Sequence, residues 1–313
     1  MAERNILEAL DEALRTGVDI QSVVGAFYSL AEQSDRATKD QMLESLDSRI
    51  REHPGERIGH VAMLAGALVE LGADPLKFPA AVFDRLLGQL SQTDADSEAD
   101  QPEWYYLLER AAMACLSRSE KLRRALPQKR AIVTNLRRYQ ERYGFLGKMI
   151  QVLDDEPLVV LHPKTGRGFR FRMHGIGDNF QLHLLLLAAL AGDGPDRIEG
   201  IVPSPEAVAA STDGSVDGKL TAESNWQLVN HLGLLAGGEI DRQDYDRTWI
   251  WNEGVPADIP SFEGSRAVLI GTSTIQRSWN AQRVFPGMAG RLDGPVPMER
   301  AEAQAMLAKM LPS

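Results

Sequence analysis

Two arginines and a histidine alternate with apolar residues in the segment 169–174, which reads Phe-Arg-Phe-Arg-Met-His. This period-two pattern predicts a β-strand, whose apolar face packs into the core while Arg170, Arg172 and His174 line the opposite face. Such a positive face can hold the carboxylate of a substrate or partner, and His174 can act as an acid or base near neutral pH. The alternative is that acidic side chains from a neighbouring strand pair with the arginines.

The predicted strand leads through a Gly-Ile-Gly turn to Asp178, which is predicted to cap the following helix. The N-terminal end of a helix carries a partial positive charge, so it would add to the attraction for an anion. We therefore group Arg170, Arg172 and Asp178 as candidate ligand-binding residues.

Two tryptophans and a glutamate mark a second patch, Trp-Ile-Trp-Asn-Glu-Gly, at 249–254. Alternation places Trp249 and Trp251 on one face of a predicted strand, where they either fill the core or form an aromatic binding wall. Glu253 follows that strand and is a candidate general base. His174 and Glu253 together define a possible catalytic acid/base pair, with the arginines holding an anionic substrate.

A hydroxyl-rich segment, Gly-Thr-Ser-Thr-Ile, occupies positions 271–275. It lacks the second glycine of a nucleophile elbow, so we do not predict a serine hydrolase. A loop of this composition after a strand can bind an anion through its backbone N–H groups, with Arg277 close by. The alternative is an ordinary loop at the exit of a strand.

We predict no metal site and no cofactor. None of the six histidines forms a His-x3-His pair, and His183 lies among leucines, which indicates a hydrogen-bonded core histidine. The acidic run 94–100 lacks the glycine and glutamate that an EF-hand needs at its sixth and twelfth positions. The single cysteine, Cys115, lies in an apolar context and is predicted to be a small buried residue.

The elements that position these residues fall into two predicted modules. Residues 1–150 have apolar residues at helical spacing, which predicts an all-α module of antiparallel helix pairs. The period and length of these pairs fit a solenoid-like stack. An acidic linker is predicted near 91–102, followed by basic helices at 104–150. The apolar stripes that predict helices lie at 6–14, 20–30, 42–50, 58–71, 82–90, 104–111 and 132–139.

Residues 151–313 are richer in short β-type runs and predict a mixed α+β module. Its first two strands, 158–162 and 169–174, are predicted to form a β-hairpin. No regular βαβ alternation is present, so we do not predict a doubly wound parallel sheet. The other predicted strands are 198–202, 248–251 and 267–270, and the predicted helices are 179–191, 221–235 and 298–311.

The net charge of −10 conceals an uneven distribution. Residues 104–150 contain 11 basic and 3 acidic residues, whereas residues 1–103 carry a net charge of −11 and residues 151–313 carry −7. We expect this basic block to dock on an acidic surface of the same chain or on a protein partner. Nucleic-acid binding is the less favoured alternative, because no nucleic-acid motif accompanies the block and the acidic flanks would oppose it.

Membrane insertion and secretion are not predicted. The longest apolar run, Leu184–Ala191, has eight residues, whereas a membrane-spanning helix needs about 20. The N-terminal residues do not resemble a secretory signal, so we expect a soluble cytoplasmic protein. The sequence therefore predicts a helical scaffold joined to an α+β module that binds a protein partner or a small anionic ligand. The alternative is an enzyme that uses His174 and Glu253.

Overall fold

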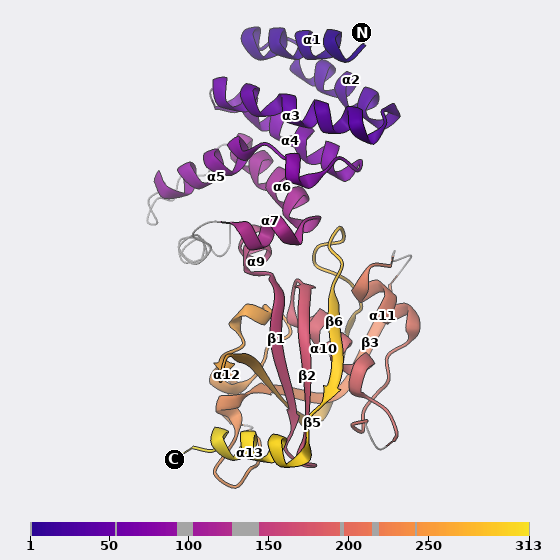
Figure 1. Cartoon of the computed structure of the whole chain (residues 1–313), viewed down its shortest axis with the longest axis vertical. Helices are drawn as coiled ribbons and strands as arrows, with labels where there is room; N and C mark the ends of the chain where they lie inside the picture. Colours follow the sequence, from indigo (N-terminus) through magenta and orange to yellow (C-terminus); the bar gives the residue numbers. More distant parts are fainter. Residues whose placement is uncertain are drawn as a thin grey trace. The chain divides into compact units, whose positions relative to one another are not determined.

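The chain divides into two compact units, Met1–Ile150 and Gln151–Ser313. The first unit is helical, and the second contains a mixed sheet with helices, which confirms the predicted fold class (Figure 1). The division falls where the sequence changes from helical to strand-like patterning. The computed structural model describes residues 2–53, 55–92, 103–126, 144–194, 197–214, 219–241 and 243–312.

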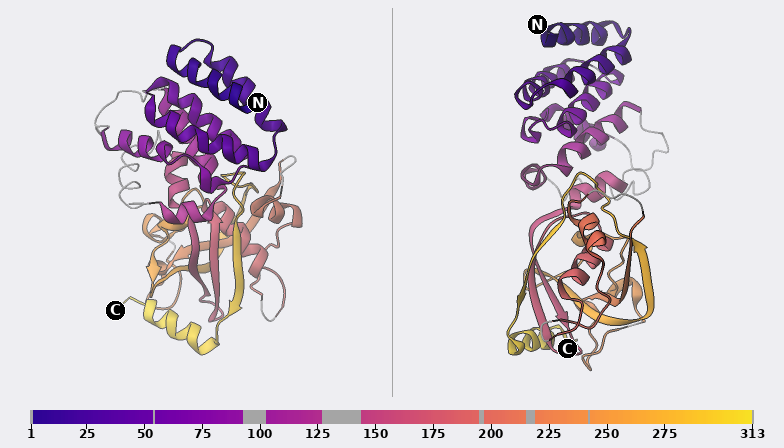
Figure 2. Two further views of the ribbon diagram at one scale, coloured as in Figure 1. Left: turned by 45° about the horizontal axis from the view of Figure 1, so that its top comes forward. Right: turned by 90° about the vertical axis from the view of Figure 1, so that its right-hand side faces the viewer.

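The N-terminal unit is built from helices that pair in chain order. α1 packs on α2, α3 on α4 and α5 on α6, and successive pairs contact each other through α2–α4, α4–α6 and α3–α5. This stacking of helix pairs is a solenoid arrangement (Figure 2). The elements are α1 (Ala2–Thr16), α2 (Ile20–Gln33), α3 (Arg36–Glu52), α4 (Glu56–Glu70), η1 (Pro75–Lys77), α5 (Ala80–Gln92), α6 (Glu103–Ser117), α7 (Glu120–Ala125) and α9 (Gly144–Gln151).

Two glycines allow α4 and α6 to pack closely. A Cβ atom at Gly59 would lie 2.9 Å from the Cα atom of Trp104, and one at Gly66 would lie 3.0 Å from the Cα atom of Ala111. The two glycines are seven residues apart and therefore share one helix face. Most of the predicted linker and the predicted helix at 132–139 lie outside the described residues.

The C-terminal unit contains a six-stranded sheet in the order β3-β5-β1-β2-β6, with β4 paired to β5. β1 and β5 are parallel and the remaining pairs are antiparallel. The predicted hairpin is present as β1 and β2. The strands are β1 (Leu153–His162), β2 (Arg167–Ile176), β3 (Thr221–Asn230), β4 (Ser261–Phe262), β5 (Ser265–Asn280) and β6 (Arg291–Pro297).

Helices cover both faces of this sheet. Phe169, Phe171 and Met173 of β2 pack in one core with leucines of α10, as the alternating pattern predicts. On the other face, Val159 and Leu161 of β1 share a second core with α13. The helices are α10 (Asn179–Leu190), α11 (Pro205–Thr212), η2 (His231–Gly233), α12 (Tyr245–Thr248), η3 (Pro256–Asp258) and α13 (Arg300–Met310).

The buried helix α10 carries a histidine within its apolar surface. The side chain of His183 is inaccessible to solvent. Its Nε2 atom lies 2.9 Å from Ser224 Oγ and its Nδ1 atom 3.3 Å from Asn252 Oδ1. Burial lowers the pKa of His183 to about 4, so the imidazole is neutral at pH 7. The prediction of a hydrogen-bonded core histidine is confirmed.

The structure corrects one predicted helix and two predicted strands. Residues 221–230, which contain several good helix formers, form strand β3 because Ala222, Trp226 and Leu228 are buried along its pairing with β5. Packing of this kind overrides local propensity. The expected strands at 198–202 and 248–251 are reduced in the described chain to two isolated bridges, Ala191–Ile198 and Val229–Trp249.

Candidate functional site

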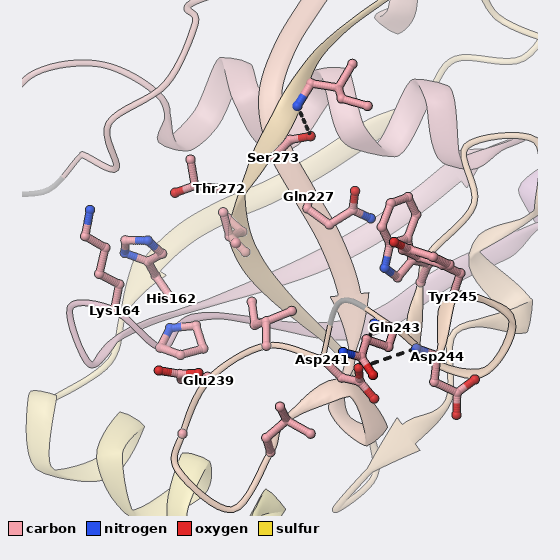
Figure 3. Close-up of a pocket in the computed structure, with 18 residues that line it drawn as sticks. His162, Lys164, Gln227, Glu239, Asp241, Gln243, Asp244, Tyr245, Thr272 and Ser273 are labelled. Atoms are coloured by element: carbon pink, nitrogen blue, oxygen red, sulfur yellow. Dashed lines mark hydrogen bonds between the residues drawn. The ribbon is translucent and has the colours of Figure 1, made fainter.

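The C-terminal unit contains an open pocket of about 1200 Å³ (Figure 3). Three stretches of chain line it: the turn that follows β1, the segment between η2 and α12, and the middle of β5. Gln227 of β3 and Trp249 complete the lining. These stretches are far apart in the sequence, and the pairing of β5 with both β1 and β3 brings them together.

Aromatic side chains form one end of the pocket. The rings of Tyr245 and Trp249 meet edge to face, with centroids 4.4 Å apart, and the ring of Trp251 lies 5.6 Å from that of Trp249. The guanidinium of Arg277 lies 5.1 Å from the Trp249 centroid, within cation–π range. It also donates a 3.2 Å hydrogen bond to Gln227 Oε1. These contacts, together with the packing of Trp249 on the core around Val229 and Leu234, hold its ring at the pocket.

The charged groups around the pocket are mostly acidic. Among the described lining residues, the carboxylates belong to Glu239, Asp241 and Asp244, and the cation is Lys164. His162 also lines the pocket, and burial, followed by the nearby charges of Lys164 and Arg167, lowers its pKa. Its imidazole is therefore uncharged at pH 7. Asp244 is paired with Arg247, so the carboxylates of the described lining that have no ion pair are those of Glu239 and Asp241.

Apolar side chains at the pocket remain accessible to solvent. Leu235 is 42%, Tyr245 45% and Ile275 71% exposed, and all three line the pocket. Trp251, which packs on Trp249, is 46% exposed. Trp249 packs against the core that contains Val229 and Leu234 and also lines the pocket, whereas Trp251 lies outside the lining. The binding wall stays a prediction.

The predicted cationic stripe on β2 is present, but each of its members has an acidic neighbour. Arg170 pairs with Glu302 of α13, and Arg172 lies 2.5 Å from Asp155 Oδ1. His174 Nε2 lies 3.1 Å from Asp293 Oδ2 on β6. The stripe therefore matches the alternative of pairing within the chain, and none of its three residues lines the pocket.

The predicted residues Asp178 and Glu253 lie near the start of α10. Asp178 caps the helix by accepting a 2.9 Å hydrogen bond from Gln181 N, as predicted. The backbone N–H of Asn179 donates to Gly254 O and its side-chain amide donates to Trp251 O, so the loop carrying Glu253 is attached to α10. The carboxylate of Glu253 interacts electrostatically with Arg277, whose pKa is lowered mainly by burial.

The two catalytic candidates do not converge on this pocket. His174 projects from the face of β2 opposite Met173, which packs against α10, whereas the loop of Glu253 is bound to α10. Neither residue belongs to the pocket lining. An acid and a base must both reach one substrate, and the geometry does not provide that for this pair in the pocket.

The hydroxyl-rich segment 271–275 belongs to strand β5 rather than to a loop. Gly271 and Thr272 pair with Gln227 and Trp226 of β3. Residues 273–276 have no register partner in β3, because Ser224 pairs with Arg277 and Trp226 pairs with Thr272, so this part of β5 bulges out of the ladder. The expected anion site falls on this bulge and stays a prediction. Arg277, the predicted partner of that anion, instead covers Trp249.

Sequence reasoning missed most of the residues that line the pocket. His162, Lys164, Glu239, Asp241 and Tyr245 have no motif spacing that distinguishes them from surface residues. One usable signal was the i, i+4 spacing of Tyr245 and Trp249 beside an acidic segment. No group of three or more His, Cys, Asp or Glu side chains in the described parts of the chain is placed to hold a metal ion.

The basic block 104–150 is only partly described. Arg123 is buried and donates a 2.7 Å hydrogen bond to Leu116 O, and Arg124 pairs with Glu120. The remaining predicted pairs, Lys129–Arg130 and Arg137–Arg138, lie outside the described residues. No helix in the described segments has the length and apolar character needed to cross a membrane.

Comparison with known proteins gives no indication of family or function. Neither a protein-family model, nor a curated protein, nor a solved structure matches the chain.

Proposed function

We propose that this protein is a binding protein, in which the pocket of the C-terminal unit receives a ligand and the helical unit acts as an interaction scaffold. The observation that carries the proposal is the pair of aromatic rings, Tyr245 and Trp249, held at an open pocket of about 1200 Å³. Solvent-exposed apolar side chains around a concave site are typical of ligand or partner recognition.

Binding is favoured over catalysis by the state of the polar groups in the pocket. Ser273 Oγ accepts a hydrogen bond from Ile275 N, and His162 Nδ1 lies 2.8 Å from Thr165 Oγ1. The catalytic candidates His174 and Glu253 lie outside the lining. The described lining residues thus offer recognition chemistry, with aromatic rings, amides and carboxylates, and these residues do not assemble a nucleophile and base.

The scaffold role rests on the helix-pair stacking and on the charge of residues 104–150. Solenoids present extended surfaces to protein partners, and a net charge of +8 over this block suits an acidic partner surface. We propose the cytoplasm as the working compartment, because the only cysteine is buried as a free thiol, which suits a reducing environment.

The pocket can be tested by blocking it. We would screen a mixture of cationic, neutral and anionic fragments by ligand-observed NMR against the full chain and a Thr272→Trp variant. Thr272 is exposed on β5 and lines the pocket, so the indole would occupy its space. The matched control is Ser278→Trp, also exposed on β5 but outside the lining.

We expect fragments that bind the unmodified protein and the Ser278→Trp variant but not the Thr272→Trp variant. If no fragment binds, or if every hit survives the Thr272→Trp change, the pocket is not a ligand site and the proposed function is wrong. Far-UV circular dichroism and the thermal unfolding midpoint would establish that both variants are folded.

A further inference from the structure

The shape of the pocket points to an extended ligand. Buried small-molecule sites usually enclose about 300–1000 Å³, whereas this pocket is larger and open. Leu235, Tyr245 and Ile275 remain exposed around it. When a partner covers exposed apolar groups beside an open groove, their removal from water stabilises the complex. A peptide segment with apolar anchors matches this surface better than an enclosed metabolite does.

The charge of the pocket restricts the chemistry of that peptide. Glu239 makes no hydrogen bond or ion pair through its side chain to any described residue. Asp241 Oδ1 accepts hydrogen bonds from the backbone N–H groups of Gln243 and Asp244, which orients its carboxylate. Asp244 pairs with Arg247. Glu239 and Asp241 therefore remain as carboxylates available to a ligand.

The cation of the described lining lies away from the aromatic end. Figure 3 shows Lys164 beside His162, whereas Asp241 and Asp244 lie near Tyr245 on the other side of the pocket. Arg242, between the two acidic residues in the sequence, is outside the described residues. Glu239 lies on the same side as Lys164 in Figure 3, and Asp244 is paired with Arg247, so Asp241 is the carboxylate of the described lining that faces a ligand beside the half-exposed Tyr245 ring. Arg277 also lies at this aromatic end, on Trp249, where it interacts electrostatically with Glu253. A carboxylate beside an exposed aromatic ring attracts ammonium and guanidinium groups.

We propose that the pocket docks a short segment of a partner protein in which lysine or arginine side chains flank an apolar anchor. This inference rests on the proposed function, because it names the ligand class for the same pocket. The apolar anchor would cover Ile275 and Leu235, and a basic side chain would lie between Tyr245 and Asp241. The net charge of −7 on residues 151–313 favours the approach of such a segment.

Fluorescence anisotropy with three labelled peptides tests the inference on the full chain. The first peptide alternates leucine with lysine and arginine, the second replaces its basic residues with glutamate, and the third replaces its leucines with serine. We expect the first peptide to bind at least about tenfold more tightly than either of the others, because only it supplies both anchors and charge. Its affinity should fall as salt is raised.

Variants separate the two contributions to affinity. The double change Glu239→Gln and Asp241→Asn should weaken the basic peptide at least about fivefold, and Ile275→Ser should weaken it by a similar factor. The control for the carboxylate variant is the double change Asp193→Asn and Glu206→Gln, which removes two exposed carboxylates outside the pocket. The control for Ile275→Ser is Val202→Ser, at a residue that is 61% exposed and also outside the pocket. Neither control should change the affinity by more than about twofold.

A charge exchange gives a positive test. The double change Glu239→Lys and Asp241→Lys should make the acidic peptide the preferred ligand, and a folded variant that still prefers the basic peptide would contradict the inference. Equal binding of the acidic and basic peptides, or full competition by equimolar spermidine, would also overturn it. If fragments bind the pocket but no peptide does, the inference is wrong and the proposed function stands; if neither binds, both are wrong.

Discussion

The buried histidine of α10 should make the C-terminal unit sensitive to mild acid. His183 has no solvent exposure, and burial is the main reason that its pKa is lowered to about 4, with the charge of Arg277 acting in the same direction. In the unfolded chain a histidine has a pKa of about 6.5. Between these two values the unfolded state binds more protons than the folded state.

The sign of the effect follows from this difference. The stabilising contribution of neutral His183 is fully present above about pH 6.5 and is lost as the pH falls towards 4. A shift of about 2.5 pKa units corresponds to roughly 3 kcal/mol of unfolding free energy at 1.36 kcal/mol per unit. This is a large part of the stability of a typical domain, which is about 5–15 kcal/mol.

Urea unfolding between pH 4.5 and 7.5 measures this contribution. Tryptophan fluorescence reports mainly on the C-terminal unit, because Trp226, Trp249, Trp251 and Trp279 belong to it. The comparison variant is His183→Gln, whose side chain does not titrate and can still donate to Asn252 and accept from Ser224. We expect the variant to be less stable at pH 7.5 and the difference to shrink by about 2–3 kcal/mol at pH 4.5.

Two results would refute this reasoning. An NMR titration in which the His183 imidazole protonates near pH 6.5 would show that the side chain is not buried as described. A stability difference between the two proteins that does not depend on pH would show that the histidine does not contribute through its ionisation.

Three further predictions concern the N-terminal unit. Burial raises the pKa of Glu109 to about 7, so the ionised group destabilises the fold as the pH rises from about 4.5 through 7; Glu109→Gln should raise the urea midpoint at pH 8 and have little effect at pH 4.5. Burial also raises the pKa of Cys115 to about 12, so iodoacetamide should label it only in urea, and rapid labelling of the native protein would contradict its burial. Gly66→Ala should lower the thermal midpoint, because the added Cβ atom would overpack α4 against Ala111. Gly25→Ala is the control: a Cβ atom there would have nothing within 4 Å, so the gain in helix propensity, about 1 kcal/mol, should raise the thermal midpoint. A rise in the midpoint for both variants would show that α4 and α6 are not in close contact.

Short-range patterns predicted a large part of the fold. The alternation at 169–174 fixed which face of β2 is apolar, and the predicted cap Asp178 begins α10 as expected. The segment 221–230 shows where such patterns fail. Its composition allows a helix, and the pairing partner that makes it a strand, β5, lies about 50 residues further along the chain.

The sequence alone determined most elements whose residues interact with near neighbours, namely α1 to α6, α10, α13 and the β1–β2 hairpin, and it also determined the uneven distribution of charge. Only the tertiary structure decided which groups meet across long separations. Arg170 is paired with Glu302, 132 residues away. The alternating pattern at 169–174 gives no sign that a carboxylate of helix α13 neutralises this arginine. His162 and Ser273, which are more than 100 residues apart in the sequence, likewise line the same pocket. Such contacts depend on the registers of β1, β3 and β5, and composition and spacing carry no information about those registers across more than 100 residues.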